Sequence, residues 1–458
     1  MKPKALKKLG IPKGNALKAA THAVMKARAS GTGKQDVINL VKALVNNPEA
    51  MKNDRIFGKT AKLMTETRSK QPAPGPAKKG VPYTQWGSDI EDGAIRQMEN
   101  ACSLPVSVKG ALMPDAHQGY GLPIGGVLAV DNAVIPYAVG MDIACRMRLS
   151  VIDFPLSCLS EDKKRMRYAI ESGTSFGLGT ISSKRHQHSV MDEDWKFSKL
   201  ISSLKDRAWS QLGTSGSGNH FVEFGVLVLE KPDLGLSPGS YPALLSHSGS
   251  RGTGAAIAEH YSRIATKRQI GLPRFLSKLA WLDLKSNPGI EYWKSMELMG
   301  KYAAANHELI HLSVISRLGA RVLATVENHH NYAWKETHSG KQVIVHRKGA
   351  TPAGKDDVGI IPGTMASPGY VVRGLGNRAS LNSAAHGAGR RLSRKAAKKR
   401  YTHNDMNQIM KQKNIELISA GLDEIPMAYK DINEVMAAQS DLVSIIARFN
   451  PKIVKMAN

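Results

Sequence analysis

Side chains that suit a transition metal recur in short polar loops of this sequence. The loop GMDIACR carries Asp142 and Cys145 three residues apart, so that both can point into one site from a tight turn. GTSGSGNHFVEF brings His220 to the start of a strand-like run, and SHSGSRGTG holds His247. A thiolate prefers a transition metal, and a carboxylate adds negative charge beside it.

A further loop, ENHHNYAW, adds His329 and His330. One histidine at a strand end is more often structural than a ligand, and a lone buried cysteine is usually inert. Together, however, these residues favour a metal site, and they exceed the four ligands of one structural zinc. A dinuclear site with Cys145 bridging would account for the excess, and two metals can hold the attacking and leaving oxygens of a phosphoryl transfer. The spacing leaves the metal open.

A different kind of chemistry is indicated by NSAAHGAGRRLSRKAAKKR, in which His386 precedes a dense run of basic residues. The pattern predicts that His386 lies at the start of a basic helix, where an anion is favoured. Arg390 and Arg394 would lie one helical turn apart and face the same anion. A neutral imidazole beside two arginines is a good nucleophile toward phosphorus. The alternative is a solvated basic helix.

Two more glycine-rich loops suit a phosphate or a nucleotide. MPDAHQGYGLPIGG combines Asp115 and His117 with glycines that let backbone amides approach an anion closely. VHRKGATPAG carries Arg347 and Lys348 into a glycine turn. A surface hairpin with charged tips is the alternative for the second loop.

The elements that must position these loops form a mixed α/β body over residues 83–458. β-branched stretches predict strands around VLAV, CRMRLSVIDF, HFVEFGVLVL, ALLSHS, QVIVHR and PGYVVRG. Helical spacing of apolar residues predicts helices over 161–172, 255–269, 292–318 and 431–449. Ahead of the body, residues 1–70 predict short amphipathic helices, and the Pro/Gly-rich segment 71–82 predicts a linker.

The charge of the chain favours a polyanionic partner. Lys and Arg number 64 against 38 acidic residues, which gives a net charge of +26, and such an excess favours nucleic acid or an anionic membrane surface. Residues 1–70 hold 16 Lys/Arg and 4 Asp/Glu. This charge predicts an extension that binds RNA, and the alternative is a basic appendage that is only exposed to solvent.

The location of the protein is predicted from three further features. Three cysteines cannot form a disulfide framework in a chain of 458 residues. The basic N-terminus lacks the apolar segment of a secretory signal. The sequence contains no run of 18 apolar residues, so no membrane-spanning helix is predicted. A cytoplasmic protein without membrane contact is expected.

Eight motifs in order resemble the RtcB-type RNA ligases: MPDAHQGYGLPIGG, GMDIAC, GSGNH, HSGSRG, HHN, HRKGA, IPGTM and HGAGR. The resemblance covers roughly residues 85–450. It implies an α+β fold with one large catalytic domain, to which the basic helical extension is added. It also implies ligation of RNA 3′-phosphate or 2′,3′-cyclic phosphate ends to 5′-hydroxyl ends, as in RNA repair or tRNA splicing, with GTP and two Mn²⁺. An activating protein factor is a further partner that the resemblance allows.

The resemblance also implies a role for individual residues. His386 would attack GTP and carry GMP. The metal ligands would be Asp142, Cys145, His220, His247 and His330. The nucleotide would be held by Asn219, Arg251, Asn331, Lys348, His386, Gly387, Gly389, Arg390 and Tyr429.

The end of the sequence departs from the family pattern. Family members commonly end in a Lys-Gly that reaches the nucleotide, whereas this sequence ends KIVKMAN, so that either Lys455 substitutes or the contact is lost. Two other functions stay open: a dinuclear metal phosphohydrolase or nuclease, which has no need of His386 and its arginines, and an RNA-binding protein with a dead ligase site.

Overall fold

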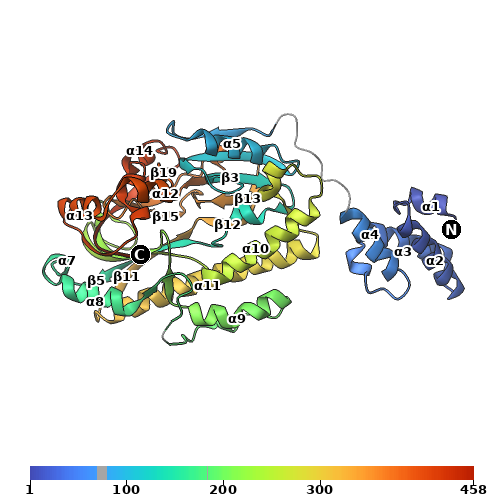
Figure 1. The fold of residues 1–458 in the computed structure, drawn as a ribbon, viewed down its shortest axis with the longest axis horizontal. Helices are drawn as coiled ribbons and strands as arrows, with labels where there is room; N and C mark the ends of the chain where they lie inside the picture. Colours follow the sequence, from blue (N-terminus) through green and yellow to red (C-terminus); the bar gives the residue numbers. More distant parts are fainter. Residues whose placement is uncertain (70–79, 183, 458) are drawn as a thin grey trace.

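The computed structural model describes residues 1–69, 80–182 and 184–457, and Figure 1 shows a small helical unit beside a larger body. We call residues 1–69 the N-terminal helical unit. Its elements are α1 (Pro3–Lys8), α2 (Asn15–Ala29), α3 (Lys34–Asn46), the 3₁₀ turn η1 (Glu49–Met51) and α4 (Gly58–Ser69). Most of the predicted linker at 71–82 lies outside the described residues.

The body contains two sheets that share its core. The first has the strand order β1-β2-β3-β13-β12, in which β1 runs parallel to β2 and the other neighbours are antiparallel. Its strands are β1 (Tyr83–Gln85), β2 (Ser107–His117), β3 (Ile124–Val130), β13 (Lys341–Lys348) and β12 (Asn331–His338). Successive β2 residues point to opposite faces, so that Leu112 and Met113 enter different hydrophobic clusters.

The second sheet has eight strands in the order β11-β5-β9-β8-β19-β16-β15, with β18 paired to β19. The strands are β11 (Arg321–His329), β5 (Arg146–Asp153), β9 (Gly239–Ser248), β8 (Phe221–Leu229), β19 (Val443–Met456), β16 (Gly369–Gly374), β15 (Val358–Ile361) and β18 (Glu416–Ser419). The stretches predicted as strands are therefore confirmed.

Long helices cover these sheets. The longest are α5 (Asp92–Cys102), α8 (Lys163–Gly173), α9 (Lys199–Gln211), α10 (Arg251–Arg268) and α11 (Asn287–Ser316). Helices α10 and α11 lie side by side (Figure 1). Helix α11 packs Met299 into the core of the first sheet and Val314 into that of the second, so it ties the two sheets together.

Shorter elements complete the body. The strands are β4 (Ala133–Val134), β6 (Ser175–Phe176), β7 (Thr214–Gly216), β10 (Leu282–Asp283), β14 (Ala350–Pro352) and β17 (Ser383–Ala385). The helices are α6 (Pro136–Val139), α7 (Cys158–Glu161), α12 (Arg394–Arg400), α13 (His403–Gln412) and α14 (Ile432–Ala437). The 3₁₀ turns are η2 (Ser189–Met191), η3 (Arg274–Leu279), η4 (Arg378–Ser380), η5 (Leu422–Glu424) and η6 (Pro426–Ala428).

One predicted helix is wrong over most of its length. The sequence analysis expected a helix over 431–449, but α14 ends at Ala437 and β19 begins at Val443. Strand β19 pairs with both β8 and β16 in the middle of the larger sheet, and this tertiary pairing overrides a local helical spacing. The helices predicted over 161–172, 255–269 and 292–318 correspond to α8, α10 and α11.

Together the mixed helices and sheets confirm the predicted α+β class. Among the described helices, none combines the length and the apolar character that crossing a bilayer requires.

Candidate active site

Neighbouring antiparallel strands bring the predicted metal ligands to one edge of the larger sheet. Cys145 directly precedes β5, and His220 directly precedes β8. His247 lies near the end of β9, where its register partners are Met147 and Phe221. Because the start of one antiparallel strand adjoins the end of the next, residues far apart in sequence meet at this edge.

His330 occupies the junction between the two sheets. Strand β11 of the larger sheet ends at His329, and β12 of the smaller sheet begins at Asn331. The amide of His330 donates a hydrogen bond to the Cys145 carbonyl at 3.0 Å. The chain therefore passes from one sheet to the other at the point where it contributes this side chain.

The five predicted ligands form two groups that share Cys145. In the first group, Cys145, His247 and His330 place one potential ligand atom each within 4.8 Å of one another. Asp142, Cys145 and His220 do the same in the second group. The Cys145 Sγ lies 3.1 Å from His247 Nε2 and 3.5 Å from His220 Nε2. A nitrogen, oxygen and sulfur set of this kind suits a transition metal.

Backbone carbonyls orient two of these histidines. His220 Nδ1 donates to the Ser215 carbonyl at 2.9 Å, and His247 Nδ1 donates to the Asn219 carbonyl at 3.0 Å. Each Nε2 is thereby left to face the cluster, which is how a ligating histidine is usually fixed in its tautomer. The buried Nδ1 of His330 has no hydrogen-bond partner among the described residues.

The cluster is electrostatically coupled. Burial alone would raise the pKa of Asp142, but the hydrogen bond and charge of His220 outweigh it and lower the pKa to about 2. Burial, followed by the charge of Asp142, raises the pKa of the Cys145 thiol well above its usual value. Burial, with His220 nearby, lowers the pKa of His247 to about 3. Neutral imidazoles and a carboxylate are the forms that bind a cation.

His386 lies beside this cluster and is held by a buried carboxylate. Its ring centroid is 4.9 Å from that of His330. Its Nδ1 lies 2.6 Å from Asp115 Oδ2, which also accepts the His386 amide at 3.1 Å. Asp115 is completely buried. With Nδ1 donating to Asp115, the Nε2 lone pair is available to an electrophile.

The prediction that His386 lies at the start of a helix is wrong. It follows β17, and the basic helix α12 begins at Arg394. The turn between them requires Gly389, which has a φ of +72° and would place a Cβ 2.1 Å from the Asp115 carbonyl oxygen. The turn therefore brings the chain against Asp115, the residue that orients His386.

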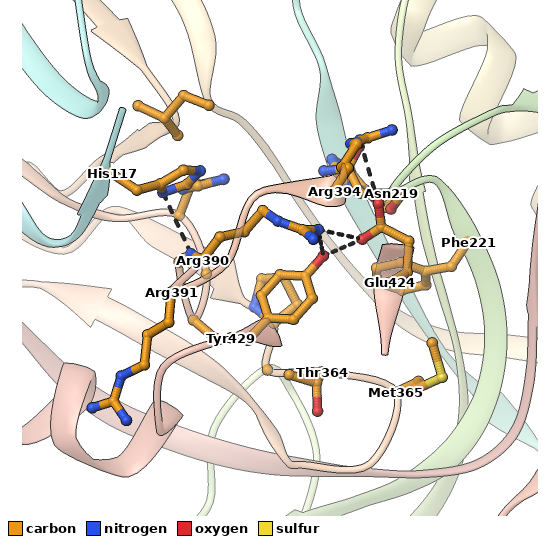
Figure 2. Close-up of a pocket in the computed structure, with 18 of the residues that line it drawn as sticks. His117, Asn219, Phe221, Thr364, Met365, Arg390, Arg391, Arg394, Glu424 and Tyr429 are labelled. Atoms are coloured by element: carbon orange, nitrogen blue, oxygen red, sulfur yellow. Dashed lines mark hydrogen bonds and ion pairs between the residues drawn. The ribbon is translucent and has the colours of Figure 1, made fainter. Parts of the chain in front are cut away.

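A cavity of about 740 Å³ opens beside His386, within the range of about 300–1,000 Å³ typical of small-molecule sites. Predicted site residues that line it are Asn219, His247, His330, His386, Gly387, Gly389, Arg390 and Tyr429. Its apolar wall comes from several strands and includes Phe221, Met365, Val454 and Met456. Figure 2 shows Phe221 and Met365 on the side of the pocket away from His117.

Arg390 and Arg394 meet on one carboxylate, although they do not share a helix. Glu424 lies 3.1 Å from Arg390 Nη1 and 3.3 Å from Arg394 Nη2. The Tyr429 hydroxyl accepts from Arg390 at 3.0 Å and donates to Glu424. Figure 2 shows this network, with the Arg390 guanidinium also 4.8 Å from the Tyr429 ring centroid. Arg390 is therefore largely satisfied within the pocket wall.

Three predicted nucleotide ligands are outside the residues that line the cavity: Arg251, Asn331 and Lys348. The side-chain amide of Asn331 donates to the backbone carbonyl of Asp142 at 3.3 Å and accepts from the backbone amide of Gly349 at 2.8 Å. Asn331 therefore connects the loop that carries Asp142 with the turn at Gly349. Arg251 donates to Thr214 Oγ1 at 3.2 Å.

Arg251 lies close to the cluster, against the backbone of Gly216. A Cβ at Gly216 would lie 1.8 Å from Arg251 Nη1 and 2.6 Å from His220 Nδ1. The Arg251 guanidinium therefore packs against the Gly216 backbone, at a position where any side chain would collide with it. Lys348 donates to the Tyr120 carbonyl, and burial followed by the charge of Lys278 lowers its pKa to about 7.

The structure directs Lys455 away from the cavity, which does not favour the alternative in which it reaches the nucleotide. Its neighbours Val454 and Met456 line the cavity, and Lys455 lies over the Phe176 ring at 5.5 Å. Alternation along β19 turns the lysine to the opposite face of the strand.

The sequence analysis did not predict two carboxylates that line the pocket. Glu223 lines the cavity, and burial raises its pKa to about 8. One acidic residue inside the apolar run FVEFGVLVL was a signal that could have found it. Glu424 is also buried, but no spacing in the sequence relates it to Arg390 or Arg394.

Sequence similarity relates the chain to one family of known proteins. A family model described as "tRNA-splicing ligase RtcB" matches residues 97–456. The "RNA-splicing ligase RtcB" of Escherichia coli K12 is 34% identical over 397 residues, which cover 80% of this chain and 95% of the relative. The "tRNA-splicing ligase RtcB" of Nanoarchaeum equitans is 32% identical over 463 residues, covering 83% and 96%. That of Thermococcus kodakarensis is 30% identical and covers 79% and 90%. The chain belongs to the RtcB family.

Proposed function

We propose that this protein is an RNA ligase that joins 3′-phosphate or 2′,3′-cyclic phosphate ends to 5′-hydroxyl ends through a guanylylated His386. GTP and two Mn²⁺ would be its cofactors. The observation that carries the proposal is the position of His386, which is oriented by Asp115 at 2.6 Å, lies 4.9 Å from the His330 ring, and opens onto a nucleotide-sized cavity. Family membership supports the same activity.

The donor set fits two metal ions. Asp142 and His220 would hold one ion, His247 and His330 the other, and Cys145 would bridge them because it belongs to both groups. Among the described residues, the buried His330 Nδ1 is the one ligand-residue atom of the cluster without a hydrogen-bond partner. Bound metal would supply charge neutralisation and Lewis acidity at the phosphates.

His386 is arranged to act as the nucleophile. Its Nε2 attacks the α-phosphorus of GTP, an N–P bond forms, the bond from the α-phosphorus to the β-phosphate oxygen breaks, and pyrophosphate leaves. Nδ1 keeps its proton throughout, and the Asp115 carboxylate stabilises the positive charge that develops on the ring. No general base is required, because the attacking nitrogen carries a lone pair.

Two transfers then complete the reaction. Water first opens a cyclic end, if one is present, to leave a 3′-phosphate. An oxygen of that phosphate attacks the phosphorus of the His386 adduct and breaks the N–P bond, which frees the imidazole. The RNA 5′-hydroxyl then attacks the activated 3′-phosphorus, and GMP leaves. Positioning and charge stabilisation account for most of such catalysis.

The purine would lie toward the apolar wall of the cavity, against Phe221 and Met456. Glu223 lies in the same wall, and no described side chain or amide donates to its carboxyl, so burial is the cause of its raised pKa. A bound guanine could donate its N1–H and its exocyclic N–H to the Glu223 carboxyl, and these two hydrogen bonds would favour the ionised form that burial alone disfavours. Glu223 is therefore the residue that would select GTP.

The function is tested with two RNA oligonucleotides, one bearing a 3′-phosphate and the other a 5′-hydroxyl, incubated with GTP and Mn²⁺. We expect a joined product that requires both end groups and is lost in His386→Ala. His403→Ala, at the exposed start of α13, is the matched control and should ligate normally. Release of phosphate or shortened RNA without any joined product would instead identify a phosphohydrolase or nuclease.

A further inference from the structure

The N-terminal helical unit has a hydrophobic core of its own. Helix α2 packs against α1, α3 and α4, and its buried residues Ala16, Ala20, Ala23 and Ala27 recur at helical spacing on one face. The core that they join extends from Leu6 to Met64 and contains no residue of the body. The unit therefore has a defined surface, and its packed helices fix the backbone positions from which the charged side chains extend.

That surface is basic, and its exposed cations have no acidic partner in the part of the chain that the structure describes. Thirteen Lys and Arg side chains are exposed among residues 1–65. They are Lys2, Lys4, Lys7, Lys8, Lys13, Lys18, Lys26, Arg28, Lys34, Lys42, Arg55, Lys59 and Lys62. None of them forms an ion pair with a described residue.

The acidic residues of the same stretch are engaged by other groups, and Glu49 also lies 4.0 Å from Arg268 of the body. Asp54 accepts the amides of Ile56 and Phe57 at 2.9 and 2.6 Å, Glu49 pairs with Lys52 at 2.7 Å, and Asp36 lies in the first turn of α3, where the helix dipole favours it. The excess positive charge is thus left for an external polyanion.

The chemistry of the surface favours phosphate contacts over base contacts. Phe57 is the one aromatic residue in 1–69, and it is 1% exposed. The unit therefore exposes no Phe, Tyr or Trp ring of the kind on which proteins that bind single strands stack their bases, and His22 is its one exposed ring. Duplex RNA is recognised mainly through its shape, phosphates and 2′-hydroxyls, which lysines on rigid helices can reach.

A membrane surface fits less well. Helices that lie in a membrane interface expose a broad apolar face. Here the apolar faces are turned into the core, and among the described residues of the unit Met25 is the one large apolar side chain that is strongly exposed.

We propose that the N-terminal helical unit is a second RNA-binding surface, which holds the sugar-phosphate backbone of a duplex region while the body acts on the broken strand. This extends the proposed function and rests on it only in taking RNA as the polyanion. The family match begins at residue 97, so the surface is an addition to the family's catalytic body.

The test removes four charges from α2 and α4, which pack together. The full-length variant Lys18→Gln/Lys26→Gln/Lys59→Gln/Lys62→Gln is compared with the wild type for binding to a blunt RNA duplex across a series of salt concentrations. Each lost phosphate contact should reduce the slope of log affinity against log salt by about 0.9. Binding to an unstructured single strand of equal length should change much less.

A matched variant controls for charge. Lys231→Gln/Lys341→Gln/Lys355→Gln/Lys411→Gln removes the same number of exposed positive charges from the body, and its duplex salt slope should stay at the wild-type value. An unchanged slope in the N-terminal variant, or an equal loss in the control, would overturn the proposal. Equal losses on duplex and single strand, or a larger loss on phosphatidylserine vesicles, would also overturn it.

The binding measurement needs neither GTP nor metal. Its result is therefore independent of whether His386 is guanylylated, and failure of the proposed ligase activity would leave a different signature, namely normal duplex binding without joined product.

Discussion

The N-terminal helical unit and the cavity beside His386 carry charge in opposite ways. In the unit, thirteen exposed cations have no acidic partner among the described residues, and few polar groups enter the core. Around the cavity, charges are buried and matched, as in Asp115 with His386 and Glu424 with Arg390. The first arrangement suits salt-sensitive binding of a polyanion by flexible side chains. The second suits fixed geometry at a reacting atom.

The difference predicts how each region should respond to substitution. An exposed, unpaired cation can be lost with little effect on folding. Loss of one member of a buried pair leaves its partner without compensation, which is costly. The predictions below compare the two regions, from the largest expected effect to the smallest.

Asp115→Asn should produce the largest loss. The amide keeps the size of the side chain but can neither hold His386 Nδ1–H in the same way nor stabilise positive charge on the ring. Guanylylation should slow by about 10²–10⁴-fold, as when a histidine loses its orienting carboxylate. Single-turnover labelling measures the rate, and metal content should be unchanged. A rate close to that of the wild type would show that Asp115 has a structural role only.

Cys145→Ala should remove the atom that both metal groups share. We expect metal affinity to fall by more than about 100-fold, since even the outer partners of ligands account for 10–100-fold. Metal content after dialysis and ligation rate are the measurements. Cys158→Ala, at a half-buried thiol outside the cluster, is the matched control. Retention of two equivalents of Mn²⁺ in Cys145→Ala would contradict the bridging role.

Glu223→Gln should change how stability depends on pH. Burial raises the pKa of Glu223 from 4.5 to about 8, so that the folded state holds a proton that the unfolded state has released. Stability of the wild type should therefore fall as pH rises from 4.5 to 8, by at most about 1.4 kcal/mol per pH unit. The glutamine variant lacks this fall.

Thermal melting of the metal-free and nucleotide-free proteins at intervals between pH 5 and 8 gives the comparison. The melting temperature of the wild type should drop relative to that of Glu223→Gln over this interval. Parallel profiles would mean that the carboxyl is not buried as an uncharged acid.

The four glutamine substitutions in α2 and α4 should have the smallest effect on stability. Because these lysines are exposed and unpaired, each should change the free energy of unfolding by no more than about 0.5 kcal/mol. Chemical denaturation measures the change. A loss of several kcal/mol would show that the lysines support the fold, and the contrast between the two regions would fail.

Much of the site was predictable from sequence because its chemistry is concentrated in short motifs. The loop residues Asp142 and Cys145 come together with His220, His247 and His330. All but Asp142 lie at or next to a strand end, and strand stretches are recognisable by their β-branched residues. The mixture of strands and helices followed from the same stretches, and the α+β class was implied by the family resemblance.

Features that depend on distant pairing could not be predicted. The run after His386 was read as one helix, but the chain at Arg390 forms a bridge to Tyr429 before α12 begins. The segment ending at 449 was read as a helix because its own spacing allowed it, although two neighbouring strands recruit it into the sheet. The direction of Lys455 likewise depends on the register of β19 with β8.

The central claim is that His386 is the nucleophile, and its direct test is labelling with GTP that carries a radioactive α-phosphate, in the presence of Mn²⁺, followed by denaturing electrophoresis. We predict a label on the protein that survives denaturation, is released by acid as a phosphoramidate, and is absent from His386→Ala but present in His403→Ala. A label that persists in His386→Ala, or no label with any divalent metal, would contradict the account.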